Sequence, residues 1–199
     1  MTTGREWHRR QAKDRRRLPL VSRRVALEPL AMRHIDGIRS ILAKEAMEDR
    51  WPVTQLDVQS PDLDRRLWAF GGLQYAVVRR DTSATVGLVQ GVFGEPRGGT
   101  IGVGVVIDPA HWRAGWPFEA IVVFIDLLFA TFGYRKIYLQ VAESTLTHMG
   151  PFLDRFLVKE ATYRAHRRSP DGYEDWHVYA LFASKWDHRF AESLLDRAV

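Results

Sequence analysis

The 199-residue sequence predicts an α+β fold, with a mostly antiparallel sheet of six to seven strands and one central β-α-β unit. Short β-branched runs recur along the chain, and turn-forming residues separate three of them as in an antiparallel meander. Residues 101–141 then have the pattern of a strand, a glycine turn, an apolar helix and a second strand. This length accommodates one domain with a proper core.

Residues 25–107 are expected to hold two helices and four strands. Residues 25–27 form a short strand, and the spacing of Ile35, Ile38 and Ile41 predicts an amphipathic helix over 32–44. A second short helix is expected before two consecutive glycines. The expected second helix and the three strands after it cover residues 62–70, 74–79, 84–93 and 100–107.

The central unit begins with a strand that Asp108 and Pro109 end. A turn with one glycine follows, and Pro117 stands where a helix takes its first residue, because that position's N–H would be unpaired anyway. Gly133 is typical of a helix end, and 136–141 is the next strand. The apolar stripe of this helix comprises Ile121, Val122, Ile125, Leu128 and Phe129.

The last third of the chain is expected to hold two helices around a pair of strands. A helix over 144–156 contains Pro151 and is therefore bent or begins late. Strands flank a turn at residues 169–172, and a terminal helix completes the chain. These last three elements are expected at 157–166, 175–182 and 186–199.

The strand, turn and helix start of the central unit together form a potential anion site. Exposed turn amides would point at the ligand, and the helix dipole adds partial positive charge there. The ligand that this suggests is a pyrophosphate. An ordinary β-α-β unit has the same pattern, so that interpretation stays open at this point.

The composition excludes several classes of site. The chain has no cysteine, which rules out disulfides, thiolate metal sites and a cysteine nucleophile. The longest apolar stretch, 120–132, is shorter than a membrane span and contains Asp126. The N-terminus lacks an apolar signal segment, so we expect a cytoplasmic protein without membrane partners.

Positive charge is concentrated at the N-terminus. Residues 1–24 hold nine Lys or Arg against two acidic residues, a net charge of +7, whereas the whole chain is +5. The expected organisation is a basic arm, 1–24, followed by a near-neutral domain, 25–199. The arm could bind nucleic acid, an anionic peptide or an acidic partner, although such a segment is more often a solvated tail.

This element order resembles that of the GCN5-related N-acetyltransferases (GNAT), and among them the branch of the ribosomal-protein-alanine acetyltransferases. The resemblance covers roughly residues 24–186. It depends on the order and spacing of Ile107-Asp108-Pro109, Trp112, Gly115-Trp116, Glu119-Ala120, Asp171-Gly172, Asp175, Tyr179 and Lys185-Trp186.

The resemblance implies a three-layer fold in which strands 100–107 and 136–141 splay apart, with the pantetheine of acetyl-CoA or another acyl-CoA between them. Turn amides would hold the pyrophosphate, and an amide near Val105 or Val106 would meet the thioester carbonyl. An amine of a peptide or small metabolite would attack directly, without a metal, through a tetrahedral intermediate. The implied cofactor-binding residues are Val105, Val106, Ile107, Arg113, Ala114, Gly115, Trp116, Phe118 and Glu119.

The sequence departs from the family pattern at several positions. Trp112 occupies a place where the family usually has Gln or Arg, and Pro117 removes one amide donor. The charge of Arg113 would compensate in part. Phe152 or Leu153 stands where a Tyr general acid often lies, and Gly102 or nearby aliphatic residues where a Glu often lies.

Other side chains are therefore candidates for proton transfer. Glu143, Ser144 and His148 directly follow strand 136–141, His111 lies at the mouth of the turn, and Glu48 belongs to the segment expected to cover the acceptor. Asp175 and His177 on a late strand are further candidates to line the cleft. Each could equally be an ordinary surface or hydrogen-bonded residue.

The leading hypothesis is an N-acetyltransferase. A non-catalytic acyl-CoA or peptide-binding module is the alternative that the missing acid and base favour. A third is an RNA- or tRNA-directed acetyltransferase that uses the arm. The sequence leaves the acceptor, the acyl length and the choice between monomer and homodimer open.

Overall fold

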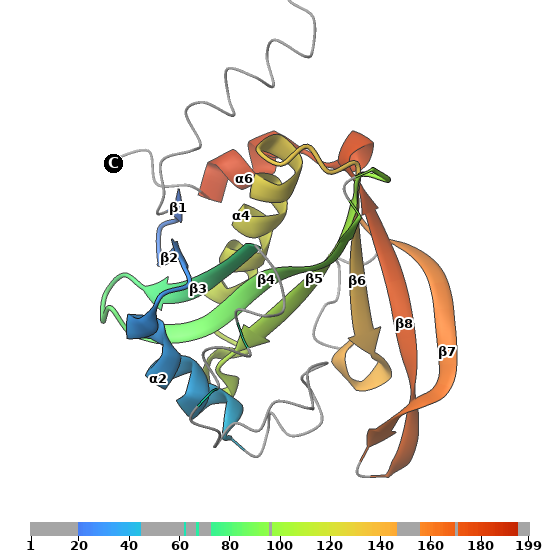
Figure 1. Cartoon of the computed structure of the whole chain (residues 1–199), viewed down its shortest axis with the longest axis horizontal. Coiled ribbons are helices and arrows are strands. Elements are labelled where there is room, and N and C mark those ends of the chain that lie inside the picture. The colour runs from blue at the N-terminus through green and yellow to red at the C-terminus, as the bar shows by residue number, and fades with distance from the viewer. Residues whose placement is uncertain are drawn as a thin grey trace, which may run out of the picture. The chain divides into compact units, whose positions relative to one another are not determined.

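A computed structural model of the chain describes residues 20–44, 62, 67, 73–95, 97–146, 156–169 and 171–194. Its eight-stranded sheet has the order β1-β2-β3-β4-β5-β6-β8-β7 (Figure 1). The α+β class is confirmed, with one or two strands more than expected. The strands are β1 (Leu20–Val21), β2 (Val25–Pro29), β3 (Leu73–Arg79), β4 (Thr85–Glu95), β5 (Thr100–Ile107), β6 (Lys136–Ala142), β7 (Val158–Ser169) and β8 (Gly172–Phe182).

The described α-helices are α2 (Met32–Leu42), α4 (Trp116–Ala130) and α6 (His188–Leu194). Two 3₁₀ turns, η2 (Pro109–His111) and η3 (Ala183–Lys185), accompany them. Contacts divide the chain into two compact units. Unit 1 comprises residues 1–90, 105–133 and 187–199, and unit 2 comprises residues 91–104 and 134–186.

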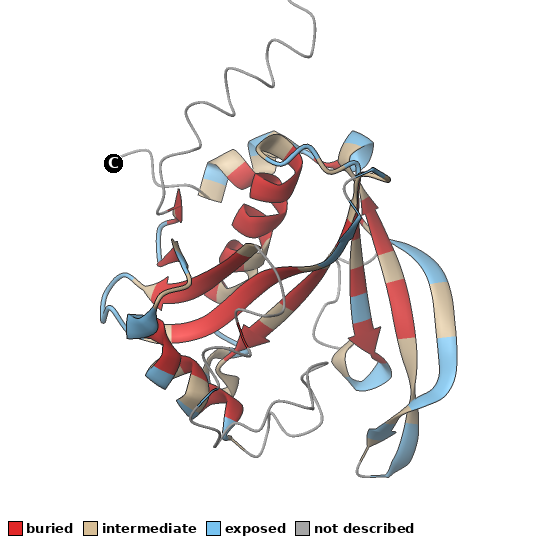
Figure 2. Ribbon diagram, viewed as in Figure 1, coloured by how far each residue is buried: buried red, intermediate tan, exposed pale blue. Residues whose placement is uncertain are grey.

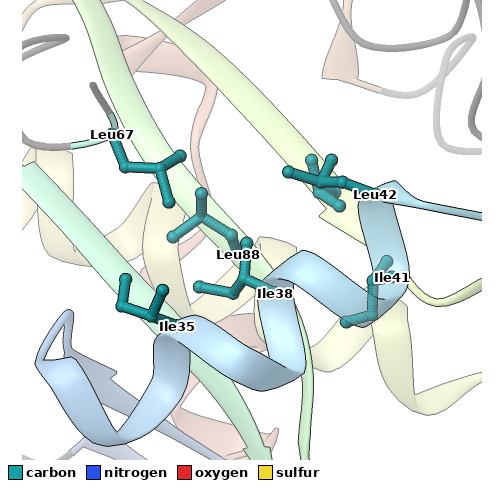
Figure 3. Packing of buried hydrophobic residues seen from close by; sticks show 7 residues of the cluster. Ile35, Ile38, Ile41, Leu42, Leu67 and Leu88 are labelled. Atoms are coloured by element: carbon teal, nitrogen blue, oxygen red, sulfur yellow. The ribbon is translucent and has the colours of Figure 1, made fainter. Parts of the chain in front are cut away.

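Unit 1 has helices on both faces of its part of the sheet. The apolar side of α2 packs on Leu88 of β4 and Val106 of β5, with Leu67 completing the cluster (Figure 3). On the other face, the ring of Tyr75 in β3 lies 5.7 Å from that of Phe124 in α4. The three-layer arrangement expected from the sequence is therefore present in this unit.

Helix α4 is buried on almost every side (Figure 2), so the single apolar stripe predicted from the sequence describes it incompletely. Ile121 of that stripe is only half-buried, whereas Asp126 is buried. Nδ1 of His188, at the start of α6, lies 2.7 Å from the Asp126 carboxylate. This contact gives a buried acid a partner, as burial of a charge requires.

Some predicted boundaries were wrong by a few residues. Helix α4 begins at Trp116, one residue before the predicted Pro117, because Gly115 at φ 74° ends the turn there. The terminal helix begins at His188 rather than at residue 186, since η3 precedes it. The two late strands are longer than predicted, since their cross-strand pairing continues to the tight turn at Ser169 and Gly172.

Strand β1 was not predicted as a strand. Leu20 and Val21 pair antiparallel with Leu27 and Ala26 of β2. Leu20 is buried, so this end of the predicted arm is part of the sheet. A two-residue strand is too short for a periodic signal in the sequence.

Unit 2 is a sheet with one parallel pair. Thr100–Val103 of β5 run parallel to residues 136–139 of β6, and β6 pairs antiparallel with β8, which pairs antiparallel with β7. Strand β7 is largely exposed, as Figure 2 shows. Nζ of Lys136, which is 9% exposed, lies 2.7 Å from the Glu160 carboxylate and anchors β7 to β6 across β8.

Two predicted elements fall mainly outside the described residues. Leu67 is helical and buried, but most of the helix expected over 62–70 is not described. Most of the helix expected over 144–156 is likewise not described. No helix in the described part of the chain combines the length and apolarity that crossing a membrane requires.

Candidate functional site

The turn between β5 and α4 has a defined backbone geometry. Asp108 caps η2 by accepting a hydrogen bond from the Ala110 amide at 3.0 Å. Gly115, with φ at 74°, is the N-cap of α4. This φ favours glycine, because a Cβ at that position meets steric hindrance from its own backbone. The α4 N-terminus therefore begins immediately after an exposed glycine.

The amides of the turn divide into two groups. Those of Ala110, His111, Trp112, Ala114 and Phe118 donate within the turn itself. In the described part of the chain, the amides of Arg113, Gly115 and Trp116 have no acceptor. Of the predicted turn donors, Ala114 and Phe118 are thus already used. The three remaining amides are suited to an anion at the positive end of the helix dipole.

Arg24 adds a positive charge to this turn. Its guanidinium Nη2 lies 2.7 Å from Oε1 of Glu119, and its Nη1 donates to the Ala114 carbonyl at 3.3 Å. The Arg24 side chain stays 49% exposed, whereas that of Glu119 is 8% exposed. Ser22 donates to the other Glu119 oxygen at 2.8 Å. The Glu119 carboxylate is therefore an anchor for Arg24, and Arg24 is the cation presented to solvent.

The indoles of Trp112 and Trp116 are held within unit 1. Trp112 Nε1 donates to the Ile107 carbonyl at 2.9 Å, and the ring remains 37% exposed. Trp116 is 2% exposed, and its ring packs against the ring of His111 at 5.1 Å and beneath the Arg79 guanidinium at 5.5 Å. Trp116 Nε1 has no hydrogen-bond partner among the described residues. Trp116 is therefore a core residue beneath the turn, and the ring of His111 packs against it.

Asp108 also connects the turn to the segment after α2. Both of its carboxylate oxygens lie 2.7 Å from Nζ of Lys44. Burial by itself would raise the pKa of Asp108. The hydrogen bonds from Lys44 and from the Ala110 amide outweigh burial, so the pKa is lower than its ordinary value. The turn is held at its strand end by a charged carboxylate.

The end of β5 distinguishes Val105 from Val106. The Asp108 amide donates to the Val86 carbonyl of β4 at 2.9 Å, and the Val106 carbonyl lies against Gly87 of β4. Because backbone groups of successive strand residues point to opposite edges, the Val106 amide also faces β4. The Val105 amide points away from β4. Of the two predicted thioester donors, only Val105 has its amide on the edge of β5 opposite β4.

Unit 2 contains a separate polar cluster at the end of β6. Glu143 directly follows β6, and its Oε2 contacts Nε2 of His177 on β8. The other ring nitrogen of His177, Nδ1, lies 3.1 Å from the Thr162 hydroxyl on β7. The amide of Ser144 donates to Glu174 at 2.9 Å. Strand β8 therefore holds the start of the segment after β6 at two points, and Thr162 of β7 supports one of them through His177.

The predicted proton-transfer residues have different outcomes. Glu48 and His148 lie outside the described residues. Glu143 and Ser144 lie together, and His111 lies in the other unit. The contacts of Arg24 with the turn, and of His177 with Glu143, were not anticipated. Nothing in the linear pattern identifies partners 95 or 34 positions apart.

A metal centre in a protein is built from several His, Cys, Asp or Glu side chains. Within the residues that the structure describes, no three His, Asp or Glu side chains are grouped so that they could hold a metal ion. The chemistry of the turn is that of amide donors and a guanidinium. Such groups bind phosphate oxygens, and they fit the pyrophosphate of an acyl-CoA.

Comparison with known families identifies the domain that contains this turn. The family profile described as "Acetyltransferase (GNAT) domain" matches residues 24–145. The matched segment contains Arg24, the turn and Glu143. No curated protein matches the sequence.

Solved structures with the same fold include several acetyltransferases. The spermidine N-acetyltransferase of Vibrio cholerae, in complex with CoA and spermine, has a TM-score of 0.70 at 16% identity, covering 81% of this chain and 96% of that chain. A GCN5-related N-acetyltransferase from Brucella melitensis has a TM-score of 0.65 at 22% identity, covering 84% and 79%. A GNAT-family acetyltransferase from Bacillus anthracis has a TM-score of 0.68 at 11% identity, covering 83% and 98%. At these identities the likeness establishes the fold.

Proposed function

The chain belongs to the GNAT acetyltransferase family, and from that premise we propose that it transfers the acetyl group of acetyl-CoA to a primary amine of a peptide or small metabolite. The observation that carries the proposal is the set of unpaired amides at the start of α4 beside the Arg24 guanidinium. Amides of Arg113, Gly115 and Trp116 bind the pyrophosphate, and Arg24 contributes charge. Together these three amides and the Arg24 guanidinium compensate for the hydrogen-bond donor that is missing at Pro117.

In this proposal a backbone amide of β5 binds the thioester. The Val105 amide donates to the carbonyl oxygen, because it faces away from β4. A donor in that position stabilises the negative charge that develops on the oxygen as the amine attacks. The Ile107 carbonyl already accepts a hydrogen bond from Trp112 Nε1. Ile107 therefore has a structural role at the end of β5 and does not offer a free acceptor to the cofactor.

Glu143 is the proposed proton acceptor for the attacking amine. Its side chain is 59% exposed, and it follows the strand that runs parallel to β5. A carboxylate attracts an ammonium ion and can take the proton that the amine must lose before attack. The candidate acceptors are of two kinds. One is a peptide N-terminal amine, as in the branch that the sequence resembles, and the other is a polyamine, since spermine is present in the Vibrio cholerae structure.

Calorimetry with two thioesters tests the cofactor part of the proposal. Acetyl-CoA contains the diphosphate, whereas S-acetylpantetheine has the same thioester without it. We expect acetyl-CoA to bind at least about 100-fold more tightly, because several charge-assisted hydrogen bonds to phosphate are lost in the shorter compound. Equal affinity for the two compounds would rule out the turn as a pyrophosphate site.

A thiol-release assay tests transfer. Spermidine and a peptide with an unblocked N-terminal alanine serve as acceptors, and mass spectrometry locates the added acetyl group. We expect CoA release that depends on one of these amines. Tight acetyl-CoA binding without release for any amine in a broad panel would instead support a non-catalytic module and contradict the proposal.

A further inference from the structure

The buried histidine of β8 lies between two polar side chains from other elements. His177 is 2% exposed, yet both of its ring nitrogens have partners: Glu143 on Nε2 and Thr162 on Nδ1. The ring of Tyr179 flanks it at 6.3 Å. A buried histidine with a partner on each ring nitrogen is held in one orientation, because another rotamer would leave buried nitrogen atoms unpaired. It therefore positions whatever it contacts.

We propose that His177 is a positioning residue for the transfer reaction: with Thr162 it holds the Glu143 carboxylate as the proton acceptor for a cationic amine. This inference rests on the proposed function, because Glu143 needs a substrate amine on which to act. Glu143 is the group that touches the substrate, and His177 acts through it. The implied acceptor class is an amine that arrives as an ammonium ion.

The hydrogen-bonding roles follow from the chemistry of the three groups. An ionised carboxylate only accepts hydrogen bonds, so Nε2 of His177 carries the hydrogen that it donates to Glu143. Nδ1 of the neutral ring then accepts from the Thr162 hydroxyl, which can rotate and accept instead if the ring becomes charged. One Glu143 oxygen is thereby held, and the other, Oε1, has no partner in the described part of the chain.

The neighbouring carboxylates already have cationic partners. Glu174 lies 4.0 Å from Arg167, and Asp175 lies 3.6 Å from Arg164. Glu160 is paired with Lys136. Among the described residues, Glu143 contacts a histidine and no lysine or arginine, so it keeps attraction for an incoming ammonium ion.

The proton transfer is balanced without any further reagent. The ammonium ion gives one proton to Oε1 of Glu143, and its lone pair becomes available to form the new bond to the acetyl carbon. The bond from that carbon to sulfur breaks, and the thiolate of CoA takes up the second proton, which the nitrogen loses as it becomes the amide. Glu143 then returns its proton to water, which its 59% exposure allows.

Four variants test the inference, with spermidine and the alanine peptide as acceptors. Glu143→Gln removes the proton acceptor, and we expect kcat to fall about 100-fold. His177→Gln keeps a hydrogen-bond donor to Glu143 but places that donor differently, so the carboxylate is less well oriented. We expect kcat to fall about 10-fold with the Kd of acetyl-CoA unchanged. Thr162→Val leaves the Glu143 contact and should move the acidic limb of the pH–rate profile. His166→Gln, on the exposed side of β7, is the matched control and should behave as wild type.

A spectroscopic readout does not depend on turnover. In ¹⁵N–¹H spectra of the histidine rings, the signal absent from His177→Gln identifies His177. We expect the wild-type ring to be the Nε2–H tautomer and its Nε2 signal to shift in Glu143→Gln, because the group that this nitrogen contacts changes from a carboxylate to an amide. This measurement keeps the inference testable if His177→Gln is too unstable to assay.

The outcomes separate the two proposals. If wild type transfers acetyl groups and His177→Gln has the wild-type kcat and pH profile, His177 does not position the base and the inference fails alone. An unchanged kcat in Glu143→Gln also overturns it. If wild type neither binds acetyl-CoA nor acetylates an amine, the proposed function itself fails and this inference fails with it.

Discussion

Arg24 and Glu119 form an ion pair that joins the start of β2 to the first turn of α4, with Nη2 of the arginine 2.7 Å from Oε1 of the glutamate. The buried carboxylate cannot move far, since Ser22 holds its second oxygen. The pair therefore fixes where an otherwise flexible guanidinium lies. That place is against Gly115 and the Ala114 carbonyl, on the turn that presents unpaired amides.

Replacing Arg24 by Ala should weaken acetyl-CoA binding about 10-fold, or roughly 1.4 kcal/mol, since a charge-assisted contact to phosphate is lost. Calorimetry measures the change. Arg23→Ala is the matched control: Arg23 is the adjacent exposed arginine, and its replacement by Ala removes the same charge. The affinity loss for Arg24→Ala should shrink as the salt concentration rises. Equal effects of the two substitutions would show that only net charge matters.

Replacing Gly115 by Ala should cost about 1 kcal/mol of stability and also weaken acetyl-CoA binding. The cost arises because φ is 74°, a conformation unfavourable for a residue with a Cβ. Gly133→Ala is the control, since φ is 70° there and a Cβ would meet no atom within 4 Å. Urea unfolding should give similar losses for both variants, and only Gly115→Ala should change the Kd. If Gly115→Ala binds acetyl-CoA with the wild-type Kd, the turn is not part of the binding site.

The ion pair of Asp108 and Lys44 should make stability depend on pH. The folded pKa of Asp108 is below its ordinary value of 3.8, so its contribution is complete above that value and is lost as the pH falls through the folded pKa. A double-mutant cycle with Asp108→Asn and Lys44→Met should give a coupling of about 0.5–1 kcal/mol at pH 7, because Lys44 is partly exposed. The coupling should be smaller at pH 3. A coupling that stays constant would contradict the assignment.

Replacing Trp116 by Phe should change the free energy of unfolding by less than about 1 kcal/mol. Removing a buried indole N–H without a partner offsets the loss of ring volume. Trp116→Ala should cost about 3–5 kcal/mol, since it leaves a cavity beneath the turn. Thermal and urea unfolding measure both. A large loss in Trp116→Phe would mean that a bound water or ligand satisfies the indole.

Much of the fold followed from local patterns. The turn at Gly115, the end of α4 near Gly133 and strand β6 each carry a signal within a few residues, and the structure confirms them to within two residues. Strand β1 carries no such signal. It is a strand because β2 offers it backbone partners, which the sequence of residues 20–21 does not reveal.

The candidate site was predicted less completely. The sequence predicted unpaired amides in the turn, and those of Arg113, Gly115 and Trp116 have no acceptor among the described residues. The pattern could not show that Ala114 and Phe118 use their amides internally. The role of Glu119 as an anchor depends on Arg24, which the charge pattern assigned to the arm. Side-chain partners far apart in the chain have no common sequence period, so only packing reveals them.

The sequence by itself determined the order of strand, glycine turn and apolar helix, because backbone preferences and hydrophobic periodicity act over a few neighbouring residues. Only the tertiary structure decided which charges meet: Arg24 with Glu119, and His177 with Glu143. These contacts form when separate elements pack, and the burial of one partner then makes its pairing necessary.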